Sequence, residues 1–304
     1  MDTVVIDSAM SPMNVATYEN PHAFFSSVIS HGQRERLKLL DSLRSALKQR
    51  EFELHYQPKM VLASSEISSM EALIRWRHPQ KGLIPPAFLI PMAEDCDMVV
   101  EIGAWVVEEV CRQIAQWREE GVSPVRVAIN LSAEQCSQDD MFNRIMHMLD
   151  VYGVAAKWLE VEVSESTVLH DPAQALETFR ALCNQGVHIA IDNFGTGYSL
   201  FSYLKRFPSH CIKIDKSFVD DLDHDHEYLE IVRAIITVSH NMGMRVVAAG
   251  IESAGQLELL RQCACDEVQG YYISPLLPAS DVAAFLHGWS GDPTLMAGCL
   301  HQGS

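Results

Sequence analysis

The sequence predicts an α/β fold whose simplest form is a (β/α)8 barrel. Short apolar segments alternate with helical stretches, and this alternation implies parallel strands joined by right-handed crossovers. About eight strand-like segments fall within ~240 residues, which is the size of such a barrel. A doubly wound open sheet is the alternative. However, no GxGxxG motif follows the first strand-like segment, as it does in the dinucleotide-binding form of that sheet.

Composition limits the classes of function. The chain has 304 residues, 48% of them hydrophobic, and a formal net charge of −17. This size allows one large domain with a substantial core, and the negative charge argues against a DNA-binding or anionic-membrane surface. No apolar run approaches the ~18 residues of a membrane helix, and the N-terminus lacks the order of a signal peptide. We therefore expect a cytoplasmic protein with no membrane segment here, although a longer parent protein could be membrane-attached.

The pattern divides the chain into three parts. Residues 1–33 have no clear period and are predicted to be a tail or linker, residues 34–290 form the barrel, and residues 291–304 form a C-terminal tail. From Arg36 onward, Leu39, Leu43 and Leu47 recur every four residues and predict an amphipathic helix over 36–50.

The barrel strands and helices are predicted in order from apolar periodicity. After "FELHYQP", the predicted strands are 70–76, 125–132, 158–166, 187–194, 211–215, 244–252 and 266–274. Helical periodicity fills the segments between them, and Gly121, Gly186 and Gly243 mark the ends of three helices.

Acids and amides stand near the end of almost every predicted strand. These residues are Glu71, Asn130, Glu162, Asp192, Asn193, Lys213, Asp215, Glu252 and Gln269. In a barrel of this class, the C-terminal ends of the strands form the active site. Carboxylates placed so closely repel one another, so positive charge is expected among them. Oxygen ligands favour Mg²⁺, Mn²⁺ or Ca²⁺ over zinc, and the sequence therefore predicts a divalent-metal site.

These residues resemble the signature of a known family. Glu71-Ala72-Leu73 looks like the EAL signature of the EAL-domain cyclic-di-GMP phosphodiesterases. The likeness covers about residues 36–288, and seven other motifs occur in order along the chain. They begin at Tyr56-Gln57-Pro58, Asn130-Leu131-Ser132, Glu162-Val163-Ser164-Glu165, Asp192-Asn193-Phe194-Gly195, Lys213-Ile214-Asp215, Ala248-Ala249-Gly250 and Gln269-Gly270-Tyr271.

The resemblance implies a fold, a reaction and roles for residues. It implies a modified barrel with one antiparallel strand, and hydrolysis of cyclic-di-GMP to linear pGpG with Mg²⁺ or Mn²⁺, for which Ca²⁺ would substitute or inhibit. Glu71, Asn130, Glu162 and Asp192 match the ligands of the first metal, and Asp192 would bridge to a second. Lys213 matches the lysine near the attacking water, with Asp215 beside it, so that the catalytic set would be Lys213, Glu71, Asp192 and Asp215. The nucleotide-binding positions would be Gln57, Leu73, Arg75, Asn193, Asp215, Glu252 and Gln269.

Two positions depart from the family pattern. Asn193 stands where the family has a second aspartate, and Ala249 stands where it has a glutamate. Both changes fall in the half of the site that would hold the second metal, whereas the first-metal set is intact. Loss of such a carboxylate typically lowers a rate by about 10²–10⁴. We therefore expect cyclic-di-GMP binding with reduced hydrolysis, whether the two residues are native or engineered.

Two other functions fit the residues. One is a catalytically inactive cyclic-di-GMP receptor that signals to a protein partner through the 36–50 helix or a dimer face. For either cyclic-di-GMP function we expect a homodimer, and a longer parent protein could carry a sensor or diguanylate-cyclase module upstream. The other is an enolase-like barrel in which acids hold Mg²⁺ and Lys213 removes a proton from carbon. The sequence lacks the capping domain that enolase-like enzymes use, which disfavours the second.

Several residues also have purely structural interpretations. Gly195-Thr196-Gly197 is consistent with a tight turn, Lys216 with a solvated charge, and Arg75 with stacking on Trp76. Tyr271 is expected to pack rather than to stack on a base. The acidic run over 220–226 is interpreted as a solvated loop that opens the next helix.

Overall fold

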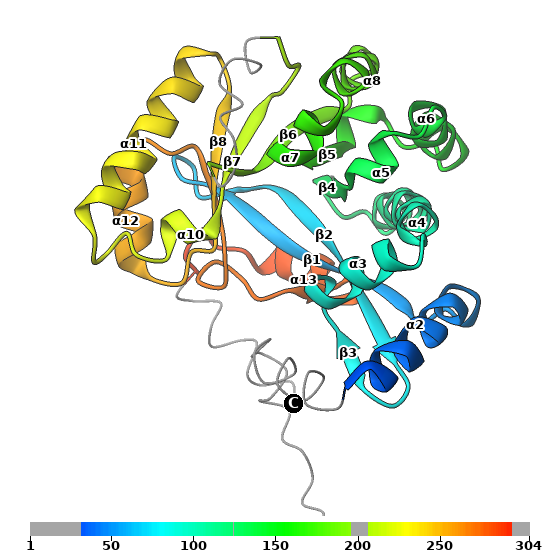
Figure 1. Cartoon of the computed structure of the whole chain (residues 1–304). Coiled ribbons are helices and arrows are strands. Elements are labelled where there is room, and N and C mark those ends of the chain that lie inside the picture. The colour runs from blue at the N-terminus through cyan, green and yellow to red at the C-terminus, as the bar shows by residue number, and fades with distance from the viewer. Residues whose placement is uncertain (1–31, 124, 196–205, 294–304) are drawn as a thin grey trace, which may run out of the picture.

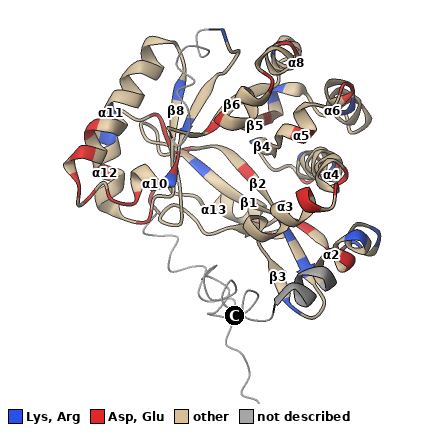
Figure 2. Ribbon diagram, in the orientation of Figure 1, with Lys and Arg blue, Asp and Glu red and all other residues tan. Residues whose placement is uncertain are grey.

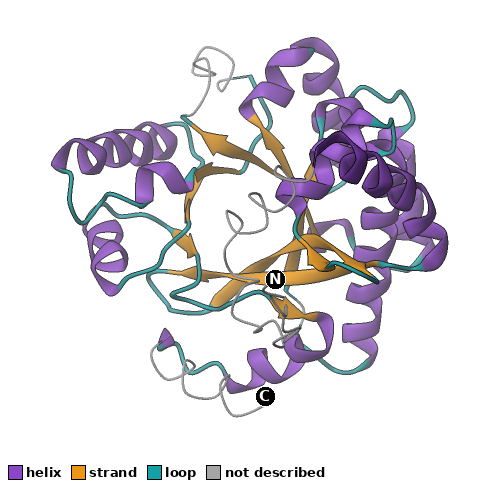
Figure 3. Cartoon of the chain, turned by 60° about the horizontal axis from the view of Figure 1, so that its bottom comes forward, coloured by secondary structure: helices purple, strands orange, loops and turns teal. Residues whose placement is uncertain are grey.

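The computed structural model describes residues 32–123, 125–195 and 206–293. Within them the strands close into a ring in the order β1-β2-β4-β5-β6-β7-β8-β9, and β9 pairs back onto β1. Figure 3 shows this ring with the helices outside it. The closed ring confirms the predicted barrel and rules out the doubly wound open sheet.

One strand of the ring runs against the others. β1 is antiparallel to both β2 and β9, whereas the pairs from β2–β4 through β8–β9 are parallel. This confirms the single antiparallel strand of the modified barrel. The strands are β1 (Phe52–Val61), β2 (Ile67–His78), β3 (Gly82–Ile84), β4 (Arg126–Leu131), β5 (Leu159–Ser164), β6 (His188–Phe194), β7 (Cys211–Ile214), β8 (Arg245–Ala249), β9 (Glu267–Gln269) and β10 (Leu277–Pro278).

The helices cover the outside of the ring, as Figure 1 shows. They are α2 (Gly32–Gln49), α3 (Pro86–Asp95), α4 (Val99–Glu119), α5 (Ala133–Cys136), α6 (Met141–Val151), α7 (Glu165–His170), α8 (Pro172–Asn184), α10 (Lys216–Val219), α11 (His226–Asn241), α12 (Ala254–Gln262) and α13 (Ala279–Gly288), with a 3-10 turn at Ala156–Trp158. The helix predicted from Leu39, Leu43 and Leu47 is α2, in which Leu39 and Leu43 are buried. None of the helices in the described ranges is long and apolar enough to cross a membrane.

Side-chain caps start the helices directly after the strands. Ser132 Oγ, after β4, accepts a hydrogen bond from the Gln135 backbone N–H, and the Ser132 backbone N–H donates to the Gln135 side-chain oxygen. Ser164, the last residue of β5, caps α7, and Asp215 after β7 caps α10. These capping bonds satisfy backbone N–H groups that a helix leaves free. They fix the point at which each strand ends, and hence the height of its last side chains.

The main core lies between the strands and the helices, while much of the barrel interior is polar. Strand alternation places every second side chain outside, where Val161, Ile191 and Ile212 are fully buried against the helical layer. Inside, a separate small apolar cluster contains Ala190, Cys211 and Val247. Buried charged side chains fill much of the rest, so the interior can support a charged site.

Some predicted boundaries were wrong. β9 ends at Gln269, not at residue 274, because the chain turns at Gly270, where a Cβ would lie 2.2 Å from the backbone N and O of Ile251. β8 ends at Ala249, and Trp158 belongs to the 3-10 turn before β5. The sequence analysis did not identify α3, β3 or β10. The predicted turn at 195–197 and most of the two predicted tails lie outside the described residues.

Candidate functional site

The ammonium of Lys213 lies at the centre of the predicted site. Its Nζ is 2.6 Å from Glu71 Oε2, 2.8 Å from Glu162 Oε2 and 3.6 Å from Asp192 Oδ1. Lys213 is 5% exposed, as its inward position on β7 predicts. Four strands therefore deliver a lysine and three carboxylates to one place, which confirms the expectation of positive charge among the acids.

The four groups strongly perturb one another. Burial would raise the pKa of Glu71, but Lys213, Lys59 and hydrogen bonds from Lys213 and Gln269 bring it to about 2. Burial, followed by repulsion from Glu71, raises the pKa of Glu162 to about 7 despite the two lysines. Burial lowers the pKa of Lys213, but the three carboxylates outweigh it and raise that pKa well above the usual lysine value. Lys213 is thus a fixed cation, and Glu162 is the carboxyl most ready to hold a proton.

Three amide side chains extend the cluster around Glu71. Asn130 Nδ2 donates to Glu71 Oε1 over 2.7 Å, and Gln269 Nε2 donates to Glu71 Oε2 over 2.7 Å. Gln269 Nε2 also lies 3.0 Å from Gln57 Oε1, across the β1–β9 pair. The Oε1 atom of Gln269 is buried without a protein hydrogen-bond partner. A buried acceptor left open in this way fits a site that takes a ligand.

The predicted nucleotide-binding residues of β2 flank the cluster. Leu73 and Arg75 follow Glu71 at two-residue intervals, so they share its side of the strand. Arg75 is 7% exposed, and its Nη1 donates to the Ile74 carbonyl over 2.9 Å. Burial lowers the Arg75 pKa, an effect opposed by the nearby Tyr271, Glu71 and Glu53. Trp76 lies on the other side of the strand, in ring contact with His78, which contradicts the alternative of Arg75 stacking on it.

Asp215 and Glu252 make other contacts. The Asp215 carboxylate caps α10 by accepting from the Ser217 backbone over 2.9 Å. The Glu252 carboxylate is about half exposed and lies 2.5 Å from Lys216 Nζ. Lys216 is therefore half of an ion pair rather than a lone solvated charge. Within the described part of the chain, the structure shows no bond from either acid to Lys213, Glu71, Glu162 or Asp192.

The two departures from the family pattern stand beside the cluster. Asn193 is exposed, with φ of 54°, where the β6–β7 register shifts between Ile191 and Phe194. Asparagine is among the few non-glycine residues that tolerate this left-handed conformation. Ala249 pairs with Gln269 at the end of β8. The carboxylates absent at 193 and 249 would thus have stood on the strands next to Lys213 and Gln269.

Sequence reasoning missed two charged groups inside the barrel. Lys59 Nζ lies 2.7 Å from Glu160 Oε1 and 2.5 Å from Glu162 Oε1, and Lys59 is 1% exposed. Strand parity could have found both, because Lys59 shares a side of its strand with Gln57, and Glu160 shares one with Glu162. Figure 2 shows both signs of charge on the strands of the barrel wall. The interior therefore carries a longer ionic network than the rim pattern alone indicates.

The donor set suits a hard divalent cation, although its oxygens now face a lysine. Among the described residues, no three His, Cys, Asp or Glu side chains form a ready metal-holding group. Glu71 and Glu162 instead share the Lys213 ammonium. Carboxylates with the amide oxygen of Asn130 are nevertheless the ligands that Mg²⁺ and Mn²⁺ prefer. The chemistry of these ligands therefore fits a hard divalent cation.

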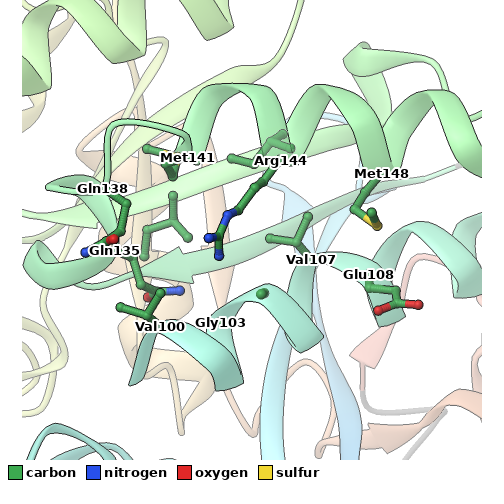
Figure 4. Close-up of a pocket in the computed structure, with 12 residues that line it drawn as sticks. Val100, Gly103, Val107, Glu108, Gln135, Gln138, Met141, Arg144 and Met148 are labelled. Carbon is green, nitrogen blue, oxygen red and sulfur yellow. The ribbon is translucent and has the colours of Figure 1, made fainter. Parts of the chain in front are cut away.

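A separate cavity lies in the helical layer between α4, α5 and α6. It has a volume of about 140 Å³, and Figure 4 shows Val107, Met141 and Met148 along it, with the Arg144 side chain reaching in among the lining residues and Glu108 at one end. The lining is mainly apolar. A small apolar cavity outside the barrel does not suit an anionic nucleotide, so the charged mouth of the barrel is the better candidate site.

Comparison with known proteins identifies the family. The sequence model of the EAL domain matches residues 40–276. The chain belongs to the EAL domain family. The bifunctional diguanylate cyclase/cyclic di-GMP phosphodiesterase MucR of Pseudomonas aeruginosa is 38% identical over 265 residues, which is 87% of this chain and 39% of MucR. The cyclic di-GMP phosphodiesterase NbdA of the same organism is 36% identical over 283 residues, covering 93% of this chain and 36% of NbdA.

A solved structure agrees with the fold of this EAL domain. The MucR phosphodiesterase in complex with c-di-GMP has a TM-score of 0.78 and 38% identity, covering 81% of this chain and 99% of that one. The chain spans well under half the length of the two curated relatives, which therefore contain more than an EAL domain.

Proposed function

We propose that this EAL domain binds cyclic-di-GMP at the C-terminal mouth of its barrel with the help of a divalent cation, and that it hydrolyses the nucleotide to pGpG slowly or not at all. The observation that carries this is the gathering of Glu71, Glu162 and Asp192 around Lys213, while positions 193 and 249 lack carboxylates. The relatives support the ligand, since MucR is a phosphodiesterase with a solved c-di-GMP complex.

The residues that would hold the cation are Glu71, Asn130, Glu162 and Asp192. When bound there, Mg²⁺ or Mn²⁺ would neutralise phosphate charge and supply Lewis-acid activation for hydrolysis, and Ca²⁺ would substitute or inhibit. The Asn130 amide now donates to Glu71, so it would turn its oxygen toward the cation. Lys213 would give up an oxygen of Glu71 or Glu162 and keep its charge near the scissile phosphate.

Other residues would hold the nucleotide. Arg75 is a buried cation beside Glu71 and suits a phosphate or a guanine edge, and Leu73 offers apolar contact. Gln57 and Gln269 add amide groups, and Asn193, Asp215 and Glu252 form the polar edge. Tyr271 is 57% exposed, contrary to the expectation that it packs, and it lies near enough to Arg75 to affect its pKa. Its exposed ring can stack on a guanine base.

A non-catalytic receptor is the second candidate, and the exposed Asn193 with Ala249 favours it. In that case ligand binding would change a homodimer face or the surface of α2, and a partner protein would detect the change. The lengths of MucR and NbdA support further modules in the parent protein, and the name of MucR includes a diguanylate cyclase, so we propose a sensor or diguanylate-cyclase module upstream. We also propose that the domain lies in the cytoplasm.

Binding and turnover are tested in one experiment. The metal-free chain is titrated with cyclic-di-GMP in a calorimeter, alone and with Mg²⁺, Mn²⁺ or Ca²⁺, and the nucleotide is then separated by chromatography. We expect metal-dependent binding with little or no pGpG. Rapid formation of pGpG would contradict the impaired site. No binding, and no change of melting temperature with guanine dinucleotides, would contradict the function and favour an enolase-like chemistry.

A further inference from the structure

Lys59 is a buried cation that the proposed reaction does not use. It comes from β1, the antiparallel strand, and is 1% exposed. Its Nζ contacts Glu160 Oε1 and Glu162 Oε1, at 2.7 and 2.5 Å. Burial lowers its pKa, but Glu160 and Glu162 outweigh that effect and raise it above the ordinary lysine value, so Lys59 remains charged.

The two oxygens of Glu162 are divided between two lysines. Oε1 accepts from Lys59, and Oε2 accepts from Lys213. Lys213 also contacts Glu71 and Asp192 at the mouth, whereas Lys59 contacts Glu160, two residues nearer the start of β5. The carboxylate is therefore held on one oxygen from inside the barrel and presents the other oxygen to the mouth.

Glu160 completes the charge balance on the inner side. Its Oε1 accepts from Lys59, and its Oε2 accepts from Arg126 over 3.2 Å. The two positive charges of Arg126 and Lys59 therefore face the Glu160 carboxylate and Oε1 of Glu162, the oxygen that points into the barrel. Because Arg126 already neutralises Glu160, that carboxylate does not by itself explain why Lys59 is buried here. The other contact of Lys59 is with Glu162, a candidate metal ligand.

We infer that Lys59 is a positioning residue for the metal site, which fixes Glu162 so that only Oε2 can bind the cation. This inference rests on the proposed function, because it takes Glu162 as a metal ligand. Partners that hold a metal-binding carboxylate from behind typically affect metal affinity by about 10–100-fold when they are removed. Among the described residues, the Lys59 side chain bonds to Glu160 and Glu162, whereas only its backbone pairs with Gln269, through the β1–β9 ladder. A change of the side chain that keeps the backbone should therefore act on the metal rather than on the nucleotide.

The test compares Glu160→Gln with the double variant Lys59→Met/Glu160→Gln. Lys59→Met alone leaves two carboxylates facing each other in the barrel and can unfold the chain. The double variant removes one positive and one negative charge, and Glu160→Gln is its matched control because it keeps Lys59. Mn²⁺ affinity is measured by electron paramagnetic resonance on metal-free protein. Nucleotide affinity is measured in chelator, and the free energy of unfolding in urea.

We expect Glu160→Gln to bind Mn²⁺ as the unaltered chain does, and the double variant to bind it about 10–100-fold more weakly. Cyclic-di-GMP affinity in chelator should not change, and Lys59→Arg/Glu160→Gln should recover part of the Mn²⁺ affinity. Equal Mn²⁺ affinity in the double variant and in Glu160→Gln would overturn the inference, even if the double variant is less stable. An unaltered chain that binds no Mn²⁺ would instead overturn the proposed function, and that titration tells the two failures apart.

Discussion

Asn193 and Ala249 stand next to a cluster that is otherwise complete. Asn193 follows Asp192 directly, and Ala249 pairs with Gln269, which donates to Glu71. Neither position can add negative charge, so the cluster balances three carboxylates against Lys213 and a share of Lys59. A site with this charge suits one divalent cation better than two, because each added cation needs carboxylates to offset it.

Restoring both carboxylates should therefore restore turnover. We expect the double variant Asn193→Asp/Ala249→Glu to raise pGpG formation by about 10²–10⁴ with Mg²⁺ or Mn²⁺. Aspartate tolerates the left-handed backbone at 193 nearly as well as asparagine, so the fold should be kept. Chromatography of the nucleotide measures the product, and Lys213→Met in the same background is the control without activity. No gain in the double variant would count against the impaired-site account.

The exposed ring of Tyr271 is expected to affect nucleotide affinity, whereas positions 193 and 249 are expected to affect turnover. Tyr271→Ala should weaken cyclic-di-GMP binding by about 1–3 kcal/mol, since that is the usual value of one base stacked on an aromatic ring. Tyr152→Ala is the matched control, because Tyr152 ends α6 and bonds to Glu108 away from the barrel mouth. Calorimetry measures both affinities. Equal loss in the two variants would show that Tyr271 acts through general destabilisation.

At the scale of elements, the turn between β9 and the next segment sets the height of Gln269. Gly270 lies against the Ile251 backbone, with room for no side chain. Ile251 N also donates to the Gln269 carbonyl over 3.1 Å, and Tyr272 N donates to the Ile251 carbonyl over 2.9 Å. The end of β9 is thus joined to the loop after β8, and both carry residues of the candidate site.

Gly270→Ala should disturb this junction. We expect it to lower the free energy of unfolding by at least about 1–3 kcal/mol, because the added methyl group meets backbone that cannot turn away. Gly288→Ala is the control, since nothing lies within 4 Å of its Cβ position at the end of α13. That change should leave stability the same or raise it by up to about 1 kcal/mol. Urea unfolding measures the free energy of unfolding of both variants. A Gly270→Ala variant as stable as the unaltered chain would mean that the turn can shift.

The elements show where sequence reasoning succeeds. Alternating apolar residues predicted β4, β5 and β6 within a residue or two at most ends, because both faces of these strands are buried in a regular pattern. The Asp225 cap explains the acidic run before α11 as a helix-opening loop, as predicted. The end of β9 was not predictable from periodicity. It depends on the close approach of the Gly270 and Ile251 backbones, which belong to different predicted segments of the chain.

In the candidate site too, the strand pattern predicted some features and left others to contacts between separate segments. Their positions near the ends of predicted strands placed Glu71, Glu162 and Lys213 at one mouth of the barrel, and their contacts show that they meet. The strand pattern could not show that Asp215 is used as a helix cap, nor that Glu252 pairs with Lys216. Those contacts depend on loop geometry. The exposure of Tyr271 likewise depends on the turn at Gly270.

For the whole molecule, the net charge of −17 is not spread evenly between surface and interior. Inside the barrel, Lys59 and Lys213 are buried with Glu71, Glu160 and Glu162. Buried ion pairs of this kind seldom raise stability over apolar packing, so their presence is consistent with the proposed binding site. Under that proposal, both stability and metal binding would depend on pH.

Two carboxyl groups act in different pH windows. The pKa of Glu71 is lowered to about 2, so its contribution to stability is complete above its ordinary value of 4.5 and is lost as pH falls toward 2. The pKa of Glu162 is raised to about 7, so between pH 4.5 and 7 the native state holds a proton that the unfolded chain has lost. Without metal, the free energy of unfolding should therefore fall as pH rises through this second window.

A divalent cation should reverse that trend, because it binds the ionised form of Glu162 and releases the proton. We expect Mn²⁺ affinity to rise about tenfold from pH 6 to pH 8 and to level off above the pKa of Glu162. Mn²⁺ should likewise raise the melting temperature more at pH 8 than at pH 6. His188→Asn is the control, since burial, with Arg126 nearby, lowers the His188 pKa to about 4, below this window. A Mn²⁺ affinity that stays constant from pH 6 to pH 8 would show that Glu162 is already ionised, and that Lys59 and Lys213 together outweigh its burial and the charge of Glu71.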